Sequence, residues 1–266
     1  MLRLLWNSKS SMMAQQEKLD CISNNIANVN TNGYKKINAN FKDLVYESLD
    51  RKGYPVSADR KGKTILQNGT GVRTSEWIRD NTQGPLTQTS LKTDLAIDGS
   101  GYFEVVQPDN SKAYTRAGNF LVDSSGTIVD QNGNRLSILD KQGNNINKVN
   151  GPYKFNANNF SVDSKGVVTI KDGNIGRQVG EVSVLDAVGD NSMISIGDSL
   201  FVPKPGTKLV KSNDYSVRQG YLELANVDIT TEMTEMLMTQ RAFQLSSTTL
   251  KTADEMWQMA NNLRGR

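Results

Sequence analysis

Apolar positions divide the chain into two long helical ends and a turn-rich middle. From Met1 to about Asn30, apolar and small side chains recur in alternating steps of four and three positions, and charged side chains lie off that seam. This heptad spacing is typical of a helix that packs along its length against another helix. The string Asn30-Thr-Asn-Gly33 tolerates left-handed backbone and therefore predicts the end of the helix. We expect about 28 helical residues, extending roughly 40 Å.

The C-terminal segment shows the same spacing. Neither Gly nor Pro occurs between Asp228 and Gly265, and apolar and small positions again step by three and four from Met236 to Ala260. Asp228 has the side chain of an N-cap residue and predicts the start of the helix. We expect roughly 30 helical residues, near 45 to 50 Å in length. Both helices exceed the usual length of about 11 or 12 residues, so each needs a long partner helix, from the other end of the chain or from a neighbouring copy.

Short runs of apolar or alternating residues fill the middle of the chain and predict β-strands. The runs are Asp94–Ile97, Tyr102–Val106, Asn119–Val122, Val167–Ile170, Glu181–Leu185 and Ser199–Val202. The sequence Val-Asp-Ser-x-Gly occurs at residues 122–126 and again at 162–166, which predicts two hairpins with the same turn. The expected fold is a mainly β central domain, an irregular hairpin-rich sandwich or barrel, with long N- and C-terminal α-helices that pair as a coiled coil.

Residues Leu49 to about Pro85 fit neither pattern. They are rich in glycine and basic side chains, and we expect an extended, weakly structured connector. The predicted organisation is an N-terminal helical segment over 1–45, the connector over 46–90, a β-rich domain over 91–205, a return connector over 206–225 and a C-terminal helical segment over 226–266.

Composition narrows the chemistry. Hydrophobic residues make up 36% of the 266 residues and the mean hydropathy is −0.51, which suits a turn-rich β body better than one thick core. The chain has no His and one Cys, so histidine acid–base catalysis, disulfides and metal sites rich in His or Cys are excluded. The net charge of +3 comes from scattered lysines and arginines, which gives little support for nucleic-acid binding. The first residues lack a signal-peptide pattern, and no apolar run reaches the roughly 20 residues needed to cross a bilayer.

Three groups of residues resemble functional sites, and each has a simpler structural interpretation. Asp98-Gly-Ser-Gly101 precedes an apolar strand rather than a helix, so a tight turn is favoured over a phosphate-binding loop. Asp123, Asp163 and the string Asp130–Asn134 contain oxygens suited to Ca²⁺, yet their spacing is not that of an EF-hand, and hairpin turns are favoured. The pair Asp254-Glu255 is consecutive on a helix and diverges. We therefore predict no catalytic, cofactor-binding or metal-binding residue and no small-molecule substrate.

The apolar seams of the two helices are the candidate functional surface. They are too long for a small β domain to cover, and such stripes mark interaction surfaces. We therefore favour packing between different copies over a two-helix coiled coil private to one chain. The predicted assembly interface consists of Leu5, Met12, Leu19, Ile22, Ile26, Val29, Met233, Met236, Phe243, Leu250 and Trp257.

Several strings resemble a known family. Asn24-Asn-Ile-Ala-Asn-Val-Asn-Thr-Asn-Gly-Tyr-Lys35 closely resembles the N-terminal signature of the bacterial flagellar rod and hook proteins. Leu95-Ala-Ile-Asp-Gly-Ser-Gly-Tyr-Phe103 and Tyr114-Thr-Arg-Ala-Gly-Asn-Phe120 resemble central motifs of that family. Gly220-Tyr-Leu-Glu-Leu-Ala-Asn-Val-Asp228 resembles its C-terminal signature, with Ala225 where Ser is commoner. The family motif residues are Asn24, Asn25, Ala27, Asn28, Thr31, Gly33, Tyr34, Asn226, Val227 and Asp228.

The resemblance implies a non-enzymatic, structural subunit of the flagellar basal-body rod, the drive shaft that transmits torque to the hook. The terminal helices would form an inner layer with those of neighbouring copies, and the β domain would face outward. Leu66–Arg73 and Gln83–Leu86 are most similar to distal rod members, and a proximal rod or hook-type axial protein is the alternative. The implied partners are further copies in a helical rod, other rod and hook proteins, and the type III export apparatus, which would carry the subunit across the cytoplasmic membrane without a cleaved signal peptide.

A secreted β-rich module that binds cell-wall polysaccharide and oligomerises through its terminal helices is a different hypothesis. Such a module would be supported by an exposed aromatic platform. Trp6 and Trp257 lie in the helical ends, and only Trp77 lies elsewhere, so the support for this function is thin.

Overall fold

The computed structural model describes residues 2–44, 46–48, 67–148, 151, 153–156, 159–172, 175–189, 192–212 and 214–264. The chain forms two compact units, which we describe separately. The helical unit contains Met1–Ile26, Ile37–Ile78 and Ile229–Arg266, and the β unit contains Ala27–Lys36 and Arg79–Asp228.

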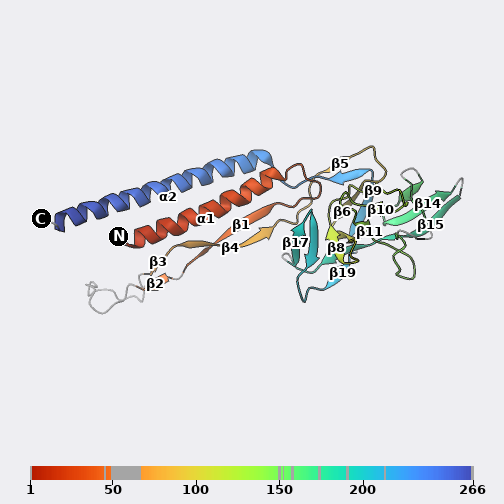
Figure 1. The fold of residues 1–266 in the computed structure, drawn as a ribbon, viewed down its shortest axis with the longest axis horizontal. Helices are drawn as coiled ribbons and strands as arrows, with labels where there is room; N and C mark the ends of the chain where they lie inside the picture. Colours follow the sequence, from red (N-terminus) through yellow and green to blue (C-terminus); the bar gives the residue numbers. More distant parts are fainter. Residues whose placement is uncertain are drawn as a thin grey trace. The chain divides into compact units, whose positions relative to one another are not determined.

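The helical unit is built on two long helices in contact with each other, α1 (Leu2–Ala27) and α2 (Ile229–Arg264). Figure 1 shows them side by side and antiparallel, so that both chain ends lie at one end of the pair. The strands of this unit form two two-stranded sheets, β1 (Ile37–Asp43) with β4 (Val72–Arg79) and β2 (Tyr46–Ser48) with β3 (Gln67–Gly69). The prediction of two long, paired terminal helices is confirmed.

Both predicted helix boundaries rest on local chemistry. Helix α1 ends at Ala27, a few residues before the predicted end, and the Thr31 N–H then donates to the Asn28 carbonyl at 3.0 Å. Gly33 has φ +68°, and a Cβ there would lie 2.5 Å from the backbone N of Ala117, so only glycine fits this turn. Helix α2 begins at Ile229, immediately after the predicted N-cap residue Asp228.

The β unit consists of short strands joined by tight turns. In chain order the strands are β5 (Leu86–Gln88), β6 (Leu95–Gly99), β7 (Tyr102–Val106), β8 (Lys112–Thr115), β9 (Leu121–Val122), β10 (Ile128–Val129), β11 (Arg135–Leu136), β12 (Ile138–Leu139), β13 (Phe160–Val162), β14 (Val167–Asp172), β15 (Ile175–Val182), β16 (Val184–Ala187), β17 (Met193–Gly197), β18 (Leu200–Pro203), β19 (Leu209–Lys211), β20 (Tyr215–Gln219) and β21 (Tyr221–Glu223).

These strands form antiparallel sheets around a main apolar core and a smaller cluster of Tyr102, Tyr114 and Phe201. A nine-stranded sheet runs β17-β18-β8-β7-β11-β10-β9, with β16 paired to β7 and β19, and a four-stranded sheet runs β12-β15-β14-β13. The pairs β20–β6 and β21–β5 complete the described strands of the unit. Phe103 and Phe120 are fully buried and pack edge to face with ring centroids 5.6 Å apart, a favoured aromatic geometry. The predicted β-rich centre is therefore confirmed.

The repeated turn is more frequent than its sequence signature suggested. In both predicted hairpins, the glycine N–H donates to the aspartate carbonyl three residues earlier, Gly126 to Asp123 and Gly166 to Asp163, each at 2.8 Å. The same bond closes the turns that begin at Asp130 and Asp140. All four glycines have φ between +77° and +80°, which explains why glycine occupies the fourth position. The repeated Asp-x-x-Gly sequence therefore specifies the hairpin turns of the β unit.

Two stretches differ from the sequence-based expectation. The run Glu181–Leu185, expected as one strand, divides at Ser183, where β15 of the four-stranded sheet ends and β16 of the nine-stranded sheet begins. Ser183 Oγ donates to Glu104 Oε2 at 2.8 Å, so a buried polar contact holds the chain where it changes sheets. In the expected connector, residues 67–69, 72–79 and 86–88 are strands, because pairing partners elsewhere in the chain satisfy their backbone groups; residues 49–66 lie outside the described residues. In the described part of the chain, no helix is both long and apolar enough to cross a membrane.

Candidate assembly surface and buried junction

Polar contacts connect the two helices at heptad intervals. The α1 residues that make them, at positions 11, 18 and 25, are spaced seven apart and therefore lie on one face of the helix. Ser11 Oγ lies 3.1 Å from Ser246 Oγ, Lys18 Nζ lies 3.3 Å from Glu235 Oε2, and Asn25 Nδ2 donates to Glu232 Oε2 at 3.1 Å. The helix pair is thus held in register by polar side chains as well as by apolar packing.

Asn25 joins three elements of the helical unit. Its Oδ1 accepts from the Ile37 N–H, and its Nδ2 donates to the Ile37 carbonyl, both at 2.9 Å, in addition to the bond to Glu232 of α2. Cys21 Sγ also donates to the Ile37 carbonyl at 3.0 Å. Asn25 and Glu232 are buried, and they line a polar cavity of about 260 Å³ together with Lys18 and Glu235. The family motif residue Asn25 therefore fixes the start of β1 against both helices.

The predicted assembly residues are unequally buried within one chain. Ile22 is fully buried, and the other predicted residues of α1 and its following turn are half-buried: Leu5, Met12, Leu19, Ile26 and Val29. On α2, Met236, Phe243 and Leu250 are half-buried, whereas Met233 and Trp257 are 53% and 44% exposed. Apart from Ile22, the buried helix positions are small or polar: Ser8, Ala14, Cys21, Asn25, Glu232, Thr239 and Ala253.

A second apolar stripe, which we call the outer stripe, follows α2. It consists of Met238, Leu245, Met256 and Leu263, whose exposed fractions are 65%, 68%, 41% and 79%. Their spacings of 7, 11 and 7 residues place all four on one face of an α-helix. The buried or half-buried residues Thr239, Ser246 and Ala253 lie on the adjacent face, so the outer stripe is separate from the face that packs on α1. The predicted interface contained no residue of this stripe, although the 7-residue spacing is readable in the sequence.

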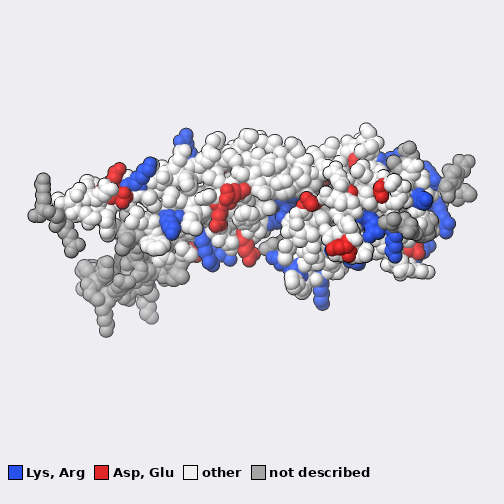
Figure 2. Space-filling model, in the orientation of Figure 1, with Lys and Arg blue, Asp and Glu red and all other residues white. Residues whose placement is uncertain are grey.

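Few charges interrupt the outer stripe. Between Met236 and Leu250 the only charged residue is Arg241, and Figure 2 shows few blue or red side chains on the visible face of α2. On α1, Trp6 and Met13 form a shorter exposed pair, again seven residues apart. Large apolar side chains exposed along one helix face are typical of an interaction site.

The β unit contains a cluster of buried charges, which we call the junction cluster: Lys35, Arg116 and Glu223. Their exposed fractions are 2%, 4% and 1%. Lys35 Nζ lies 2.7 Å from Glu223 Oε1, and Arg116 Nε lies 2.6 Å from Glu223 Oε2. Lys35 also donates to the Thr82 carbonyl at 2.7 Å, and the Gly84 N–H donates to Glu223 Oε1 at 3.0 Å. Each charge is thus paired and hydrogen-bonded, as buried charges must be.

Backbone contacts extend the junction cluster. The Gly33 N–H donates to the Glu223 carbonyl at 2.8 Å. Asn226 Oδ1 accepts from the Lys36 N–H at 2.6 Å, and its Nδ2 donates to the carbonyls of Asp80 and Thr82 at 3.0 and 3.1 Å. The motif residues Gly33 and Asn226 therefore join three stretches of chain that are distant in sequence.

Burial sets the electrostatics of the cluster. It lowers the pKa of Lys35 below the ordinary value of 10.5, and the attraction of Glu223 opposes that shift. Burial likewise lowers the pKa of Arg79, whose guanidinium stacks 4.9 Å from the Phe201 ring centroid and donates to the Lys35 carbonyl. These groups serve structure, because every one of them is engaged with another part of the same unit.

The remaining family motif residues lie around these two sites. Tyr34 is buried, Asn28, Thr31 and Val227 are half-buried, and Asn24, Ala27 and Asp228 are exposed. Thr31 Oγ1 donates to Asn28 Oδ1 at 3.2 Å, which stabilises the turn after α1. Sequence reasoning quoted Lys35, Arg116 and Glu223 only as members of family strings and assigned them no role.

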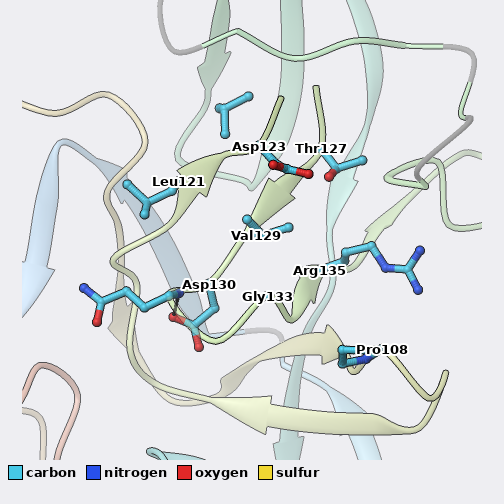
Figure 3. Close-up of a pocket in the computed structure, with 10 residues that line it drawn as sticks. Pro108, Leu121, Asp123, Thr127, Val129, Asp130, Gly133 and Arg135 are labelled. Carbon is cyan, nitrogen blue, oxygen red and sulfur yellow. Dashed lines mark hydrogen bonds between the residues drawn. The ribbon is translucent and has the colours of Figure 1, made fainter. Parts of the chain in front are cut away.

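An open depression of about 610 Å³ lies over β9, β10 and β11. Asp123, Asp130 and Arg135 line it, and in Figure 3 the Arg135 guanidinium extends away from both carboxylates. Asp130 Oδ1 accepts from the Gln131 N–H of its own turn, and burial raises the pKa of Asp130. The two carboxylates belong to separate hairpin turns, which agrees with their interpretation as turn residues. Among the described residues, no group of three or more Cys, Asp or Glu side chains is placed to hold a metal ion.

Comparisons with known proteins identify the class to which these features belong. Three family models match the chain: "Flagella basal body rod protein" over residues 5–35, "Flagellar hook protein FlgE/F/G D1 domain" over 96–170, and "Flagellar basal body rod FlgEFG protein C-terminal" over 218–263. The first and third cover most of the two helices, and the second lies in the β unit.

Relatives match over nearly the whole length. The flagellar basal-body rod protein FlgG of Borreliella burgdorferi is 33% identical over 272 residues, covering 99% of both chains. FlgG of Bacillus subtilis is 36% identical over 276 residues, covering 99% of this chain and all of the relative. The flagellar hook-basal body complex protein FlhP of the same organism is 29% identical over equal coverage. The chain belongs to the flagellar basal-body rod family.

Within this family the chain is a FlgG-like distal rod subunit and a structural, non-enzymatic protein. The resemblance noted in the sequence, the predicted function and the prediction that the chain is not an enzyme are confirmed.

Proposed function

We propose that the chain polymerises into the rod through its terminal helices, with neighbouring copies covering the outer stripe of α2, and that the resulting shaft transmits torque to the hook. The observation that carries this proposal is the outer stripe itself, four large apolar side chains exposed along one face of a helix whose other face already packs on α1. Pairing of α1 with α2 of the same chain leaves the outer stripe exposed to solvent. Each subunit therefore uses two kinds of helix packing: α1 with α2 within the chain, and the outer stripe of α2 with neighbouring copies.

The free energy available from burying the outer stripe indicates that each subunit packs against several neighbours in the rod. Full burial of one Leu or Met side chain contributes about 1.5–3 kcal/mol, and because the four residues of the outer stripe are already partly buried, covering the rest offers on the order of 4–8 kcal/mol. Association of two proteins costs about 4–15 kcal/mol in lost translational and rotational freedom. One stripe buried by one neighbour roughly balances this cost. At a growing rod end, several neighbours bury apolar surface of the incoming subunit at once. The total burial then exceeds the cost of association, so assembly is favourable.

The finer organisation and the partners are part of the same proposal. Residues 1–45 and 226–266 would contribute the inner helical layer, residues 91–205 would face outward, and 46–90 and 206–225 would connect the layers. We expect contacts with other rod and hook proteins, and export through the flagellar type III apparatus without a cleaved signal peptide. Family membership supports both expectations.

Substitution of the outer stripe tests the proposal. Leu245→Asp places a charge on a side chain that is 68% exposed, so the single chain should fold normally. In an assembled rod the same charge would be buried without a partner, which is strongly unfavourable. We expect this variant to be exported but absent from isolated basal bodies, and the cells to be non-motile.

The neighbouring variant Gln244→Asp is the matched control, because it adds the same charge at an exposed position outside the stripe. It should be incorporated and support swimming. Wild-type incorporation of Leu245→Asp would contradict the proposal, as would equal loss of incorporation in both variants.

A further inference from the structure

The carboxylate of Glu223 holds groups from three separate stretches of the chain. Lys35 comes from the stretch after α1, Gly84 from the segment that follows β4, and Arg116 from the turn after β8. Lys35 and Glu223 are 188 positions apart in sequence. One buried anion thus closes contacts between parts of the chain that share no local structure.

Two of these stretches, those of Lys35 and Gly84, lie near positions at which the chain passes between the units. The chain passes between the units after residues 26, 36, 78 and 228. Lys35 and Lys36 precede the second passage, Arg79 and Asp80 follow the third, and Asn226 precedes the fourth. Asn226 bonds to Lys36, Asp80 and Thr82, so the exits are fixed relative to one another within the β unit.

The burial of the cluster makes this arrangement specific. Exposed ion pairs tolerate many geometries because water replaces either partner at little cost. In the junction cluster water is excluded, and any displacement leaves a buried charge without a partner. The exits of the chain should therefore have one low-energy arrangement.

We propose that Glu223 is a positioning residue that locks the chain exits of the β unit and thereby makes the subunit stiff enough to carry torque. This inference rests on the proposed role as a torque-transmitting shaft. It assigns to the junction cluster the mechanical role of holding the segments that continue into the helical unit.

Hydrogen exchange on the full-length chain tests the lock without requiring assembly. In Glu223→Gln, the amides of Gly84 and Asp80, which donate to Glu223 Oε1 and to the Lys36 carbonyl, should exchange at least tenfold faster than in the wild type. Amides between β14 and β15 should exchange at the wild-type rate. Lys35→Met removes a single cation and should likewise speed exchange at Gly84 and Asp80 alone. If Glu223→Gln does not fold, the exchange rates of Lys35→Met test the lock in its place.

Two control variants separate the lock from general stability. Glu181→Gln makes the same chemical change in an exposed ion pair with Lys211, in which Glu181 is 38% exposed. Val168→Ala weakens the core, where Val168 is fully buried, without touching the junction cluster. Neither control should speed exchange at Gly84 and Asp80 selectively.

Swimming under load tests the mechanical consequence. Glu223→Gln and Lys35→Met should be incorporated into basal bodies at wild-type levels, yet cells should stop swimming at a medium viscosity at least twofold lower than cells with either control. Incorporation is scored separately, so a failure of helix-driven assembly is distinguishable from a failure of the lock. Unchanged exchange at Gly84 and Asp80, or wild-type swimming under load in both junction variants, would overturn the inference.

Discussion

At the scale of single residues, small and polar side chains occupy the tightest positions in this protein. Gly118 shows this most directly, because a Cβ there would lie 1.6 Å from the carbonyl oxygen of Leu95. Asn25 and Glu223 organise their surroundings through hydrogen bonds. Apart from Ile22, the large apolar side chains of the helices remain half-buried or exposed. Specific geometry therefore comes from glycines and paired polar groups, and the apolar surface is left for association.

Gly118→Ala should be strongly destabilising, because the methyl group cannot be accommodated without moving a strand. We expect a loss of about 4 kcal/mol or more, or failure to fold, which is the range of severe core substitutions. Gly176→Ala is the control, since the nearest atom to its added methyl is 3.4 Å away, an ordinary contact. Denaturant unfolding of the two variants compares them, and equal stability would contradict the close packing at Gly118.

Lys35 makes stability depend on pH in a defined direction. Burial lowers its pKa in the folded state below 10.5, so between the lowered value and 10.5 the unfolded chain binds more protons than the folded chain. The free energy of unfolding therefore rises with pH across this window. Lys35→Met has no such group, so the difference in unfolding free energy, wild type minus variant, should increase as the pH rises through the window that ends at 10.5. A difference that stays flat or decreases in urea titrations would show that the Lys35 pKa is not lowered.

At the scale of elements, α2 is unusual because it carries large apolar side chains on a face beside the one that contacts α1. One face contacts α1 through Ser246, Glu235 and Glu232, and the other carries the outer stripe. An isolated long helix is marginally stable, and most helical stability comes from packing of an apolar face. A helix with two such faces suits a subunit that uses one face within the chain and the other between chains.

Asn25→Ala should weaken the attachment of α1 to β1 and α2. The change leaves the Ile37 N–H without its side-chain acceptor and removes one of the two side-chain donors to the Ile37 carbonyl, to which Cys21 still donates. A buried group left unsatisfied costs about 1–3 kcal/mol. We expect the helical signal in circular dichroism to melt at a lower temperature. Asn7→Ala, at an exposed position of α1, should melt nearly as the wild type does; equal effects in both variants would contradict the assigned role of Asn25.

Much of the element structure was readable from local sequence because its causes are local. The helices follow from heptad spacing and their end residues, and the hairpins follow from the Asp-x-x-Gly turns. The division at Ser183 was not predictable, because it depends on contacts with Glu104 and Ser137 from distant strands. The Lys35–Glu223 pair was not predictable for the same reason, because its members are 188 positions apart in sequence. Each is a charged residue in one of the strings that resemble the family signatures. The outer stripe lies outside the predicted interface because heptad spacing was traced along a single seam of α2, and the stripe follows a second one.

At the scale of the whole molecule, the two units differ in how completely they bury their apolar side chains. The β unit has its own core of buried aromatic and aliphatic side chains. The helical unit keeps apolar surface exposed, on α2 above all. The absence of His and the single buried Cys fit a subunit whose work is mechanical. Stability of the helical unit should therefore be greater in the rod than in the single chain.

The central claim is that neighbouring copies cover the outer stripe, and thiol labelling of Leu245→Cys tests it most directly. The introduced thiol replaces a side chain that is 68% exposed, whereas the native Cys21 is 2% exposed and provides a low background in the parent protein. In the soluble single chain, a maleimide reagent should label position 245 rapidly. In isolated basal bodies, the same position should react at least tenfold more slowly. Equal labelling rates in the single chain and in basal bodies would contradict the account.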